Sequence, residues 1–219
     1  MHIKYLFSSI IIAALFTQCK SSGSGGEATF CDTTCQTDSI KFNRDDIDKE
    51  PYVYISMDQC NPDTIFWSHS GLAKNLAMPF ADLVDHGLKI NKTHTMAHII
   101  GTDHAWLELN DCETGRGYLI KLPYEKSNSI SKYSSALTHF DKKFSIADGL
   151  ICYADYSFVY VEDMATGKTE KLLLGDAELK IDWKNLHATF DSVNVSRNRI
   201  FVTVIEYGNK RTLEKTISL

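Results

Sequence analysis

Runs of alternating β-branched and aromatic residues constrain the fold of this chain more than any other feature of its sequence. Such runs have the two-residue period of β-strands, whose successive side chains point to opposite faces of a sheet. Helical periodicity is weak and is confined to HSGLAKNLAMPFADLVDHG and KIDWKNLHATF. The sequence therefore predicts an all-β fold with short helices only in the connections. The strand-like runs are YVYISM, DTIFWSH, HAWLEL, GYLIKL, LICYAD, FVYVEDM, RIFVTVIEY and LEKTISL.

Two of the strand pairs share nearly the same turn. AWLELNDCETGRGYLIKLP and FVYVEDMATGKTEKLLLG both have the order strand, Asp, two residues, Thr-Gly, a basic residue and strand. Asp111 corresponds to Asp163, and residues 114–116 correspond to residues 166–168. The glycine of each turn supplies the positive φ that a tight hairpin requires. The sequence thus predicts a repeated β-hairpin.

Two further hairpins are predicted, one around Gly208 and one with Asn61 and Pro62 at its turn. A short strand precedes two of the hairpins, so that a unit has about four strands and recurs every 40–50 residues or so. The segment FSIADGLICYADYSFVYVEDMATGKTEKLLL resembles a β-propeller blade in which a Thr-Gly-Lys turn joins the outer strands. This resemblance implies four propeller-like antiparallel units, an incomplete or small β-propeller. A two-sheet β-sandwich uses the same strands and is the alternative.

The front of the chain has the pattern of an export signal. Lys4 precedes an apolar run from Tyr5 to Phe16, which is shorter than the roughly 20 residues that a membrane-spanning helix needs. We therefore predict that residues 1–18 are a signal peptide.

Phe16, Thr17, Gln18 and Cys19 follow at the end of this run, and they resemble the lipobox of bacterial lipoproteins. In that family the cysteine becomes the lipidated first residue of the mature chain. The usual pattern has Leu at the position of Phe16 and a small residue at that of Gln18, but relaxed lipoboxes of Bacteroidota-like lipoproteins are similar. The resemblance implies acylation of Cys19, whereas an ordinary secretory signal followed by an unmodified cysteine is the alternative.

Residues 19–29 are rich in Gly and Ser, as expected of a flexible linker, and residues 30–219 are expected to form a single β-rich domain. The predicted location is the bacterial cell envelope, as an outer-membrane lipoprotein that faces the periplasm or the cell surface. The expected partners are the membrane, through palmitate or another acyl chain, and an envelope protein or a glycan. The formal charge of −5, without a basic cluster, does not favour nucleic-acid binding, and no cofactor is expected.

The remaining cysteines suit an oxidising compartment. Cys31, Cys35, Cys60 and Cys112 are candidates for two disulfides, and three connectivities are open. Cys152 lies in a predicted buried strand, where we expect it to be unpaired. A zinc site built on Cys31 and Cys35 is the alternative, but the spacing of these two residues is not repeated downstream.

The densest group of possible metal ligands is THTMAHIIGTDHAW, with His94, His98, Asp103 and His104. On a helix His94 and His98 would share one face, but on a strand four residues span about 13 Å. The neighbouring β-branched residues favour a strand, and the Glu of the HExxH motif is absent. We therefore favour structural histidines, and a metal-dependent hydrolase that uses His94, His98 and His104 is kept as an alternative function.

FNRDDIDKE is a candidate for Ca²⁺ binding through Asp45, Asp46, Asp48 and Glu50. It lacks the spacing and the turn glycine of an EF-hand loop, so a solvated acidic turn is the favoured interpretation.

No nucleophile elbow, phosphate-binding loop or Cys-x-x-Cys pair is present in the sequence. Trp67 and Trp106 lie in matching strands and are expected in the core, although exposed rings would suit a glycan-binding module. The leading hypothesis is a lipid-anchored envelope protein that binds or assembles and does not catalyse.

Overall fold

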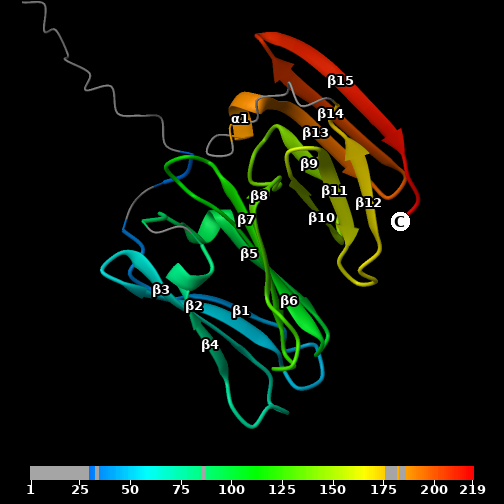
Figure 1. Ribbon diagram of the computed structural model, residues 1–219. Coiled ribbons are helices and arrows are strands. Elements are labelled where there is room, and N and C mark those ends of the chain that lie inside the picture. Colours follow the sequence, from blue (N-terminus) through cyan, green and yellow to red (C-terminus); the bar gives the residue numbers. More distant parts are fainter. Residues whose placement is uncertain (1–29, 33–34, 85–86, 176–181, 183–185) are drawn as a thin grey trace, which may run out of the picture.

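The computed structural model describes residues 30–32, 35–84, 87–175, 182 and 186–219, and within these ranges the chain is all-β (Figure 1). Its strands form three sheets, which we call the first, central and third sheets. Every strand pair is antiparallel except the pair of β9 with β13. The prediction of an all-β fold is therefore confirmed.

The first sheet is a meander in which each strand pairs with the next along the chain. Its strands are β1 (Ile40–Asn43), β2 (Tyr52–Asp58), β3 (Asn61–Ser68) and β4 (Leu76–Pro79).

The central sheet has seven strands in the order β12-β11-β10-β8-β7-β6-β5. In the strand register its two halves pair at Ala136 of β8 and Tyr153 of β10, and the backbone N–H of Leu137 also donates to the carbonyl of Cys152 at 2.9 Å. One half contains β5 (Thr95–Ile100), β6 (His104–Asn110), β7 (Gly117–Pro123) and β8 (Ser131–Ala136), and the other contains β10 (Leu150–Ala154), β11 (Phe158–Asp163) and β12 (Thr169–Leu173).

The third sheet has the strand order β15-β14-β13-β9. The short strand β9 reaches this sheet from the middle of the chain and pairs parallel with β13. The strands are β9 (Phe144–Ile146), β13 (Phe190–Ser196), β14 (Arg199–Glu206) and β15 (Asn209–Thr216).

Helical structure is brief and lies in connections, as the weak periodicity predicts. The apolar segment after residue 69 forms β4 and a single 3-10 turn, Phe80–Asp82. A second 3-10 turn, Lys92–His94, leads into β5, and the α-helix α1 (Leu186–Thr189) leads into β13. Most of the second candidate helix, residues 180–190, lies outside the described residues or in β13.

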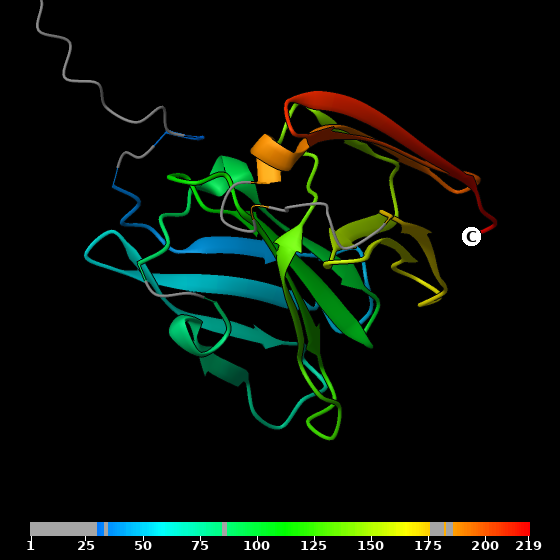
Figure 2. The same ribbon diagram turned by 45° about the horizontal axis from the view of Figure 1, so that its top comes forward.

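Two hydrophobic cores lie on the same face of the central sheet. The first core lies between the first sheet and strands β5–β7, and it contains Ile55, Trp67 and Leu107. The second core lies between the third sheet and strands β10–β12, and it contains Val161 and Val202. Figure 2 shows the third sheet as a layer over the yellow strands and the first sheet beside the green ones. The central sheet is thus the element that both cores share.

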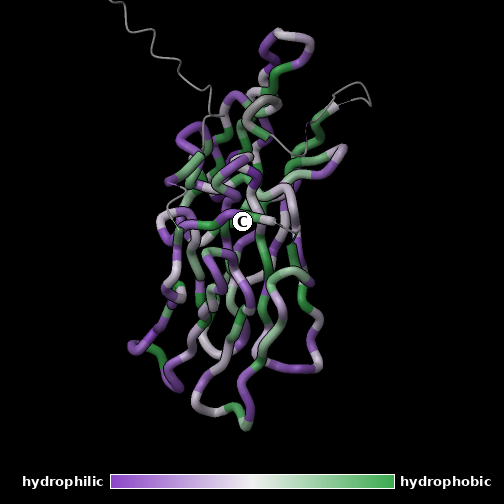
Figure 3. Tube along the Cα trace, turned by 90° about the vertical axis from the view of Figure 1, so that its left-hand side faces the viewer, coloured by the Kyte–Doolittle hydropathy of each residue, from purple (hydrophilic) through white to green (hydrophobic). Residues whose placement is uncertain are grey.

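Strand β6 is buried along its whole length because both of its faces are covered. Ala105, Leu107 and Leu109 point into the first core, whereas the alternate residues point to the opposite face of the sheet. Polar residues gather in the connecting loops, and apolar residues lie mainly along the strands (Figure 3).

The repeated turn has the same hydrogen bonds in both copies. The backbone N–H of Gly115 donates to the carbonyl of Asp111 at 2.8 Å, and that of Gly167 donates to the carbonyl of Asp163 at 2.8 Å. The two glycines have φ of +72° and +71°, which is the left-handed region that favours glycine. In each copy the aspartate carboxylate also accepts from the threonine three residues later. The sequence repeat is therefore a structural repeat.

The second carboxylate oxygen of each turn aspartate fastens the turn to a distant segment. Asp111 Oδ1 accepts from the backbone N–H of Lys89 at 3.1 Å. Asp163 Oδ2 accepts from the guanidinium of Arg197, which lies in the turn between β13 and β14 of the third sheet. The aspartate of each turn thus stabilises its own hairpin and also fastens that hairpin to a distant segment of the chain.

The prediction that Asn61 and Pro62 form the first hairpin turn is wrong. The turn is made by Gln59 and Cys60, with φ of +46° and +69°, and residues 61 and 62 are the first residues of β3. Both positions of such a turn require positive φ, and the proline ring locks φ near −65°. The hairpin between β14 and β15 has the same geometry, with positive φ at Tyr207 and Gly208.

The ion pair between Asp163 and Arg197 should make stability depend on pH in the acid range. The hydrogen bond from Arg197, followed by that from the Thr166 backbone, lowers the pKa of Asp163 to about 2. A carboxylate whose folded pKa lies below its unfolded value contributes stability above the unfolded pKa and loses it as the pH falls through the folded pKa. Between about pH 5 and 2 the wild type should lose about 2 kcal/mol more unfolding free energy than Asp163→Asn.

Urea unfolding at a series of pH values measures this difference. Glu113→Gln, which changes an exposed carboxylate in the matching turn, is the control and should follow the wild type. If the unfolding free energies of the wild type and of Asp163→Asn change with pH by the same amount, the prediction is contradicted.

Candidate functional site

The face of the central sheet opposite to the cores, which we call the second face, carries most of the chemically versatile side chains. The strand register and the alternation of side chains assign residues to this face. Residues on this face include Met96, His98, His104, Trp106, Glu108, Leu119, Lys121, Tyr133, Ile151, Tyr153, Phe158, Tyr160, Glu162 and Lys171.

A row of aromatic rings crosses this face from β6 to β11. The ring centroids of Trp106 and Tyr133 lie 6.4 Å apart, and those of Tyr133 and Tyr153 lie 4.0 Å apart. Tyr160 continues the row at 5.1 Å from Tyr153, and Phe158 lies 5.8 Å from Tyr160. Such aromatic pairs contribute about 0.5–1.5 kcal/mol each beyond their burial.

Stacking and lysine contacts cover part of the ring surface in this row. The faces of the inner rings cover one another, and a lysine stands over the ring at each end. Lys121 Nζ lies 5.1 Å from the Trp106 ring centroid, and Lys171 Nζ lies 4.1 Å from that of Phe158. These ring contacts give the row a role in stabilising the sheet.

A buried carboxylate shared by two histidines lies at one end of this face. Glu108 comes from β6, and its side chain is only 9% exposed. Its Oε2 lies 3.1 Å from Nε2 of His98, on the neighbouring strand β5. The same oxygen lies 3.6 Å from Nδ1 of His139, which is in the connection between β8 and β9. Three segments of the chain therefore converge on one oxygen atom.

The cluster shifts the protonation equilibria of its members. Burial by itself would raise the pKa of Glu108, but the hydrogen bonds from His139 and His98 outweigh it, and the pKa lies below its usual value. The hydrogen bond to Glu108 raises the pKa of His139 against the effect of burial. The geometry therefore favours an ionised carboxylate beside a histidine whose protonated form the carboxylate stabilises.

A cavity of about 410 Å³ opens beside this cluster. This volume is within the range of small-molecule sites in proteins, which are mostly apolar with a few convergent polar groups. The walls are formed by Met96, His98, Glu108, His139, Ile146, Ala147, Asp148, Gly149, Leu150 and Met164. We call this cavity the Glu108 cleft, and it is the candidate functional site.

The three histidines singled out in the sequence occupy different places. His98 lies in the Glu108 cleft, but His94 lies in the 3-10 turn before β5, where its ring contacts Phe30 and Phe140. His104 lies at the opposite end of β6, with its Nδ1 2.6 Å from Asp103 Oδ2. It lines a second, smaller hollow of about 280 Å³. Within the described ranges, no group of three or more His, Cys, Asp or Glu side chains is able to hold a metal ion.

The acidic residues before β2 lie in an exposed turn. Arg44 forms two hydrogen bonds of 2.7 Å with the carboxylate of Asp46, so the negative charge of this turn is partly neutralised within it. Asp45, Asp48 and Glu50 are also exposed.

Both tryptophans of the proposed glycan platform are buried. Trp67 is 4% exposed and belongs to the first core, where its Nε1 donates to the carbonyl of Pro123 at 2.8 Å. Trp106 is 1% exposed. Neither ring offers a free face to a sugar.

The four candidate cysteines form two nested disulfides. Cys31 pairs with Cys112 and Cys35 pairs with Cys60. Cys152 is a buried free cysteine, and burial raises the pKa of its thiol. A buried thiol with a raised pKa is not nucleophilic.

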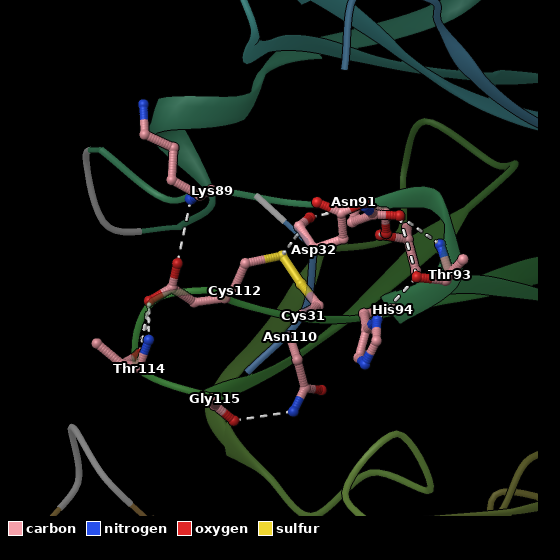
Figure 4. Close-up of a disulfide and its surroundings, with 12 residues drawn as sticks. Cys31, Asp32, Lys89, Asn91, Thr93, His94, Asn110, Cys112, Thr114 and Gly115 are labelled. Carbon is pink, nitrogen blue, oxygen red and sulfur yellow. Dashed lines mark hydrogen bonds between the residues drawn. A yellow bond between two sulfur atoms is a disulfide. The ribbon is translucent and has the colours of Figure 1, made fainter. Parts of the chain in front are cut away.

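The Cys31–Cys112 disulfide fastens the segment that follows the predicted linker to the domain (Figure 4). The backbone N–H of Phe30 donates to the carbonyl of Cys112 at 2.7 Å, and the side-chain amide of Asn91 donates to the carbonyl of Asp32 at 2.7 Å. Covalent and hydrogen bonds thus hold the chain where it enters the β-rich part. Cys19, the signal peptide and the linker lie outside the described residues.

Comparison of the chain with protein-family models, with curated proteins and with solved structures finds no match in any of the three. In the part of the chain that the structure describes, no helix has the length and apolar character needed to span a membrane. Function is therefore inferred from the residues of the chain alone.

The sequence reasoning missed two members of the central cluster, Glu108 and His139. Strand alternation in HAWLELN puts Glu108 on the same face as Trp106, so its position was open to prediction. His139 lies in an irregular connection and is 31 residues away (139 − 108), so no local pattern indicates that the two side chains meet.

Removing the longer disulfide should destabilise the protein more than removing the shorter one. The two bridges close loops of 81 and 25 residues. In the chain-entropy model these loops correspond to about 4.5 and 3.5 kcal/mol of unfolding free energy. Denaturant unfolding of Cys31→Ala/Cys112→Ala and Cys35→Ala/Cys60→Ala should show this order. Cys152→Ala, which leaves both bridges intact, is the control, and a reversed order would contradict the prediction.

Replacing Glu108 should lower the pKa of His139. Glu108→Gln removes the negative charge that holds the proton on His139, and ¹H–¹³C NMR of the histidine rings measures the titration. Glu162→Gln is the matched control because Glu162 is a buried carboxylate on the same face that pairs with Lys121 at 3.8 Å. An unchanged His139 titration in Glu108→Gln would show that the two groups do not interact.

Proposed function

We propose that this chain is a lipid-anchored protein of the bacterial cell envelope, attached to the outer membrane through Cys19, and that its β-rich domain binds a ligand. The position of Cys19 is the observation that supports the anchoring part of this proposal. Cys19 stands between the apolar run and the Gly/Ser segment, where a thiol has no packing role.

The attachment of the domain supports the same proposal. A protein held by its N-terminus transmits force to the first fixed residues of the domain. Here those residues are held by a disulfide to Cys112 and by the hydrogen bond between Asn91 and Asp32. Nested disulfides also suit an exported protein, because they persist in oxidising compartments.

Binding is proposed in preference to catalysis because of what the Glu108 cleft contains. In the part of the chain that the structure describes, its lining has no Ser, Thr, Cys or Lys side chain to act as a nucleophile. It does have apolar walls and a few converging polar groups, which is the composition of a ligand site.

We also propose that the three sheets derive from four propeller-like units. Strands β1–β4 and β5–β8 are two successive four-stranded meanders, and β10–β12 and β13–β15 are two three-stranded ones. The units β1–β4 and β5–β8 pack face to face around the first core, and the units β10–β12 and β13–β15 do so around the second, as blades do. The second and third units instead join edge to edge in the central sheet. An experimental structure in which the units do not fan about a common axis would favour the sandwich interpretation.

Metabolic labelling tests the anchor. Cells that express the chain with radiolabelled palmitate should yield a labelled protein that partitions into the detergent phase of Triton X-114. The same chain with Cys19→Ala should be unlabelled, because the acyl chains have no other attachment point in the proposal.

Cys152→Ala is the matched control, since it removes a cysteine that is buried in the domain, and it should be labelled like the wild type. Equal labelling of Cys19→Ala and wild type, or an unmodified mature N-terminus in mass spectrometry, would exclude anchoring at this residue.

A further inference from the structure

The charge of the Glu108 cleft is one-sided. Among the described residues its lining contains two carboxylates, Glu108 and Asp148, and two histidines, but no lysine or arginine. Glu108 is nine-tenths buried and keeps its charge, because the hydrogen bonds from the histidines lower its pKa. An ionised carboxylate in a wall of low dielectric attracts a cation more strongly than it would in water. The second hollow differs, because Lys121 lines it.

The rest of the lining is apolar and adaptable. Met96, Ile146, Leu150 and Met164 supply hydrocarbon and thioether surface. Methionine side chains adjust to ligands of different shapes because they are unbranched and polarizable. Met96 is 37% exposed on the edge strand β5, so the cleft is open to solvent on that side. The volume of about 410 Å³ equals that of about 14 water molecules at roughly 30 Å³ each.

We propose that the Glu108 cleft binds an organic cation, a protonated amine whose ammonium group pairs with Glu108 and whose alkyl part lies against Met96 and Met164. The ammonium group takes the place that His139 now occupies beside Glu108 Oε2. Asp148, which is exposed at the rim, adds a second negative charge. This inference names the ligand class of the proposed binding function.

Competition with His139 gives this site a pH signature. Protonated His139 and the ammonium group are alternative cations for the same carboxylate, so affinity should rise as the pH rises through the pKa of His139. The other titratable groups around His139 are Glu108 on β6, Asp148 after β9, His94 before β5 and, across Glu108, His98 on β5. His139→Gln removes the competing cation and should flatten the pH profile.

The test uses the full exported protein, labelled with ¹³C at the methionine methyl groups, and a pair of probes of equal length and opposite charge. n-Butylammonium should shift the methyl resonances of Met96 and Met164, with a Kd of about 1 mM. Butyrate should leave them unshifted. Met96→Leu and Met164→Leu assign the two resonances.

Variants then show which carboxylate of the Glu108 cleft binds the ammonium group. Glu108→Gln should weaken butylammonium binding about tenfold or more, because it removes a charge-assisted hydrogen bond. Asp148→Asn changes an exposed residue, so its folding is not at risk, and it should weaken binding about threefold. Glu162→Gln, a buried carboxylate outside the cleft, should have no effect.

Methyl shifts with butyrate as large as those with butylammonium would overturn the inference. So would an affinity for butylammonium that is unchanged in both Glu108→Gln and Asp148→Asn. The absence of any methyl shift at about 50 mM butylammonium, far above the expected Kd, would also overturn it. The lipidation experiment is independent of this one. If the protein is labelled by palmitate but does not bind butylammonium, the proposed anchor stands and the proposed ligand class is excluded. If it binds butylammonium but is not labelled, the ligand class stands and the anchor is excluded.

Discussion

Burial of one face of the central sheet holds this molecule together. The first and third sheets share no strand, yet each packs its apolar side chains against a different half of the same seven-stranded sheet. The two halves meet at the pair of Ala136 and Tyr153, and a stack of Tyr133 on Tyr153 crosses the same junction. Because both cores depend on this junction, the aromatic row on the second face has a structural role.

The second face shows how buried charge is tolerated in such a sheet. Glu108 and Glu162 are both buried, but their pKa values are shifted in opposite directions. Burial dominates at Glu162, because Lys121 is 3.8 Å away, and the pKa is raised. At Glu108 two histidines outweigh burial, and the pKa is lowered. Glu108, the carboxylate whose pKa is lowered, lines the Glu108 cleft, and this environment underlies the proposed ligand preference.

Polar turns and disulfides provide long-range connections that the apolar cores do not. Each turn aspartate uses one carboxylate oxygen for its own hairpin and the other for a segment of a different sheet or connection. The Cys31–Cys112 disulfide fastens the start of the domain to the turn that begins at Asp111, so the same turn receives both kinds of cross-link. The point at which a membrane tether would pull is thus among the most constrained parts of the described chain.

The sequence by itself determined the local structure: strand alternation indicated the all-β fold, and the Asp-x-x-Thr-Gly pattern indicated two hairpins, because both depend on residues that are close along the chain. It misplaced the turn before β3, where two residues of positive φ precede the proline. Only the tertiary structure decided which cysteines pair and which histidines meet Glu108. These contacts join residues of different segments, and their formation depends on how the sheets pack, which no local pattern records.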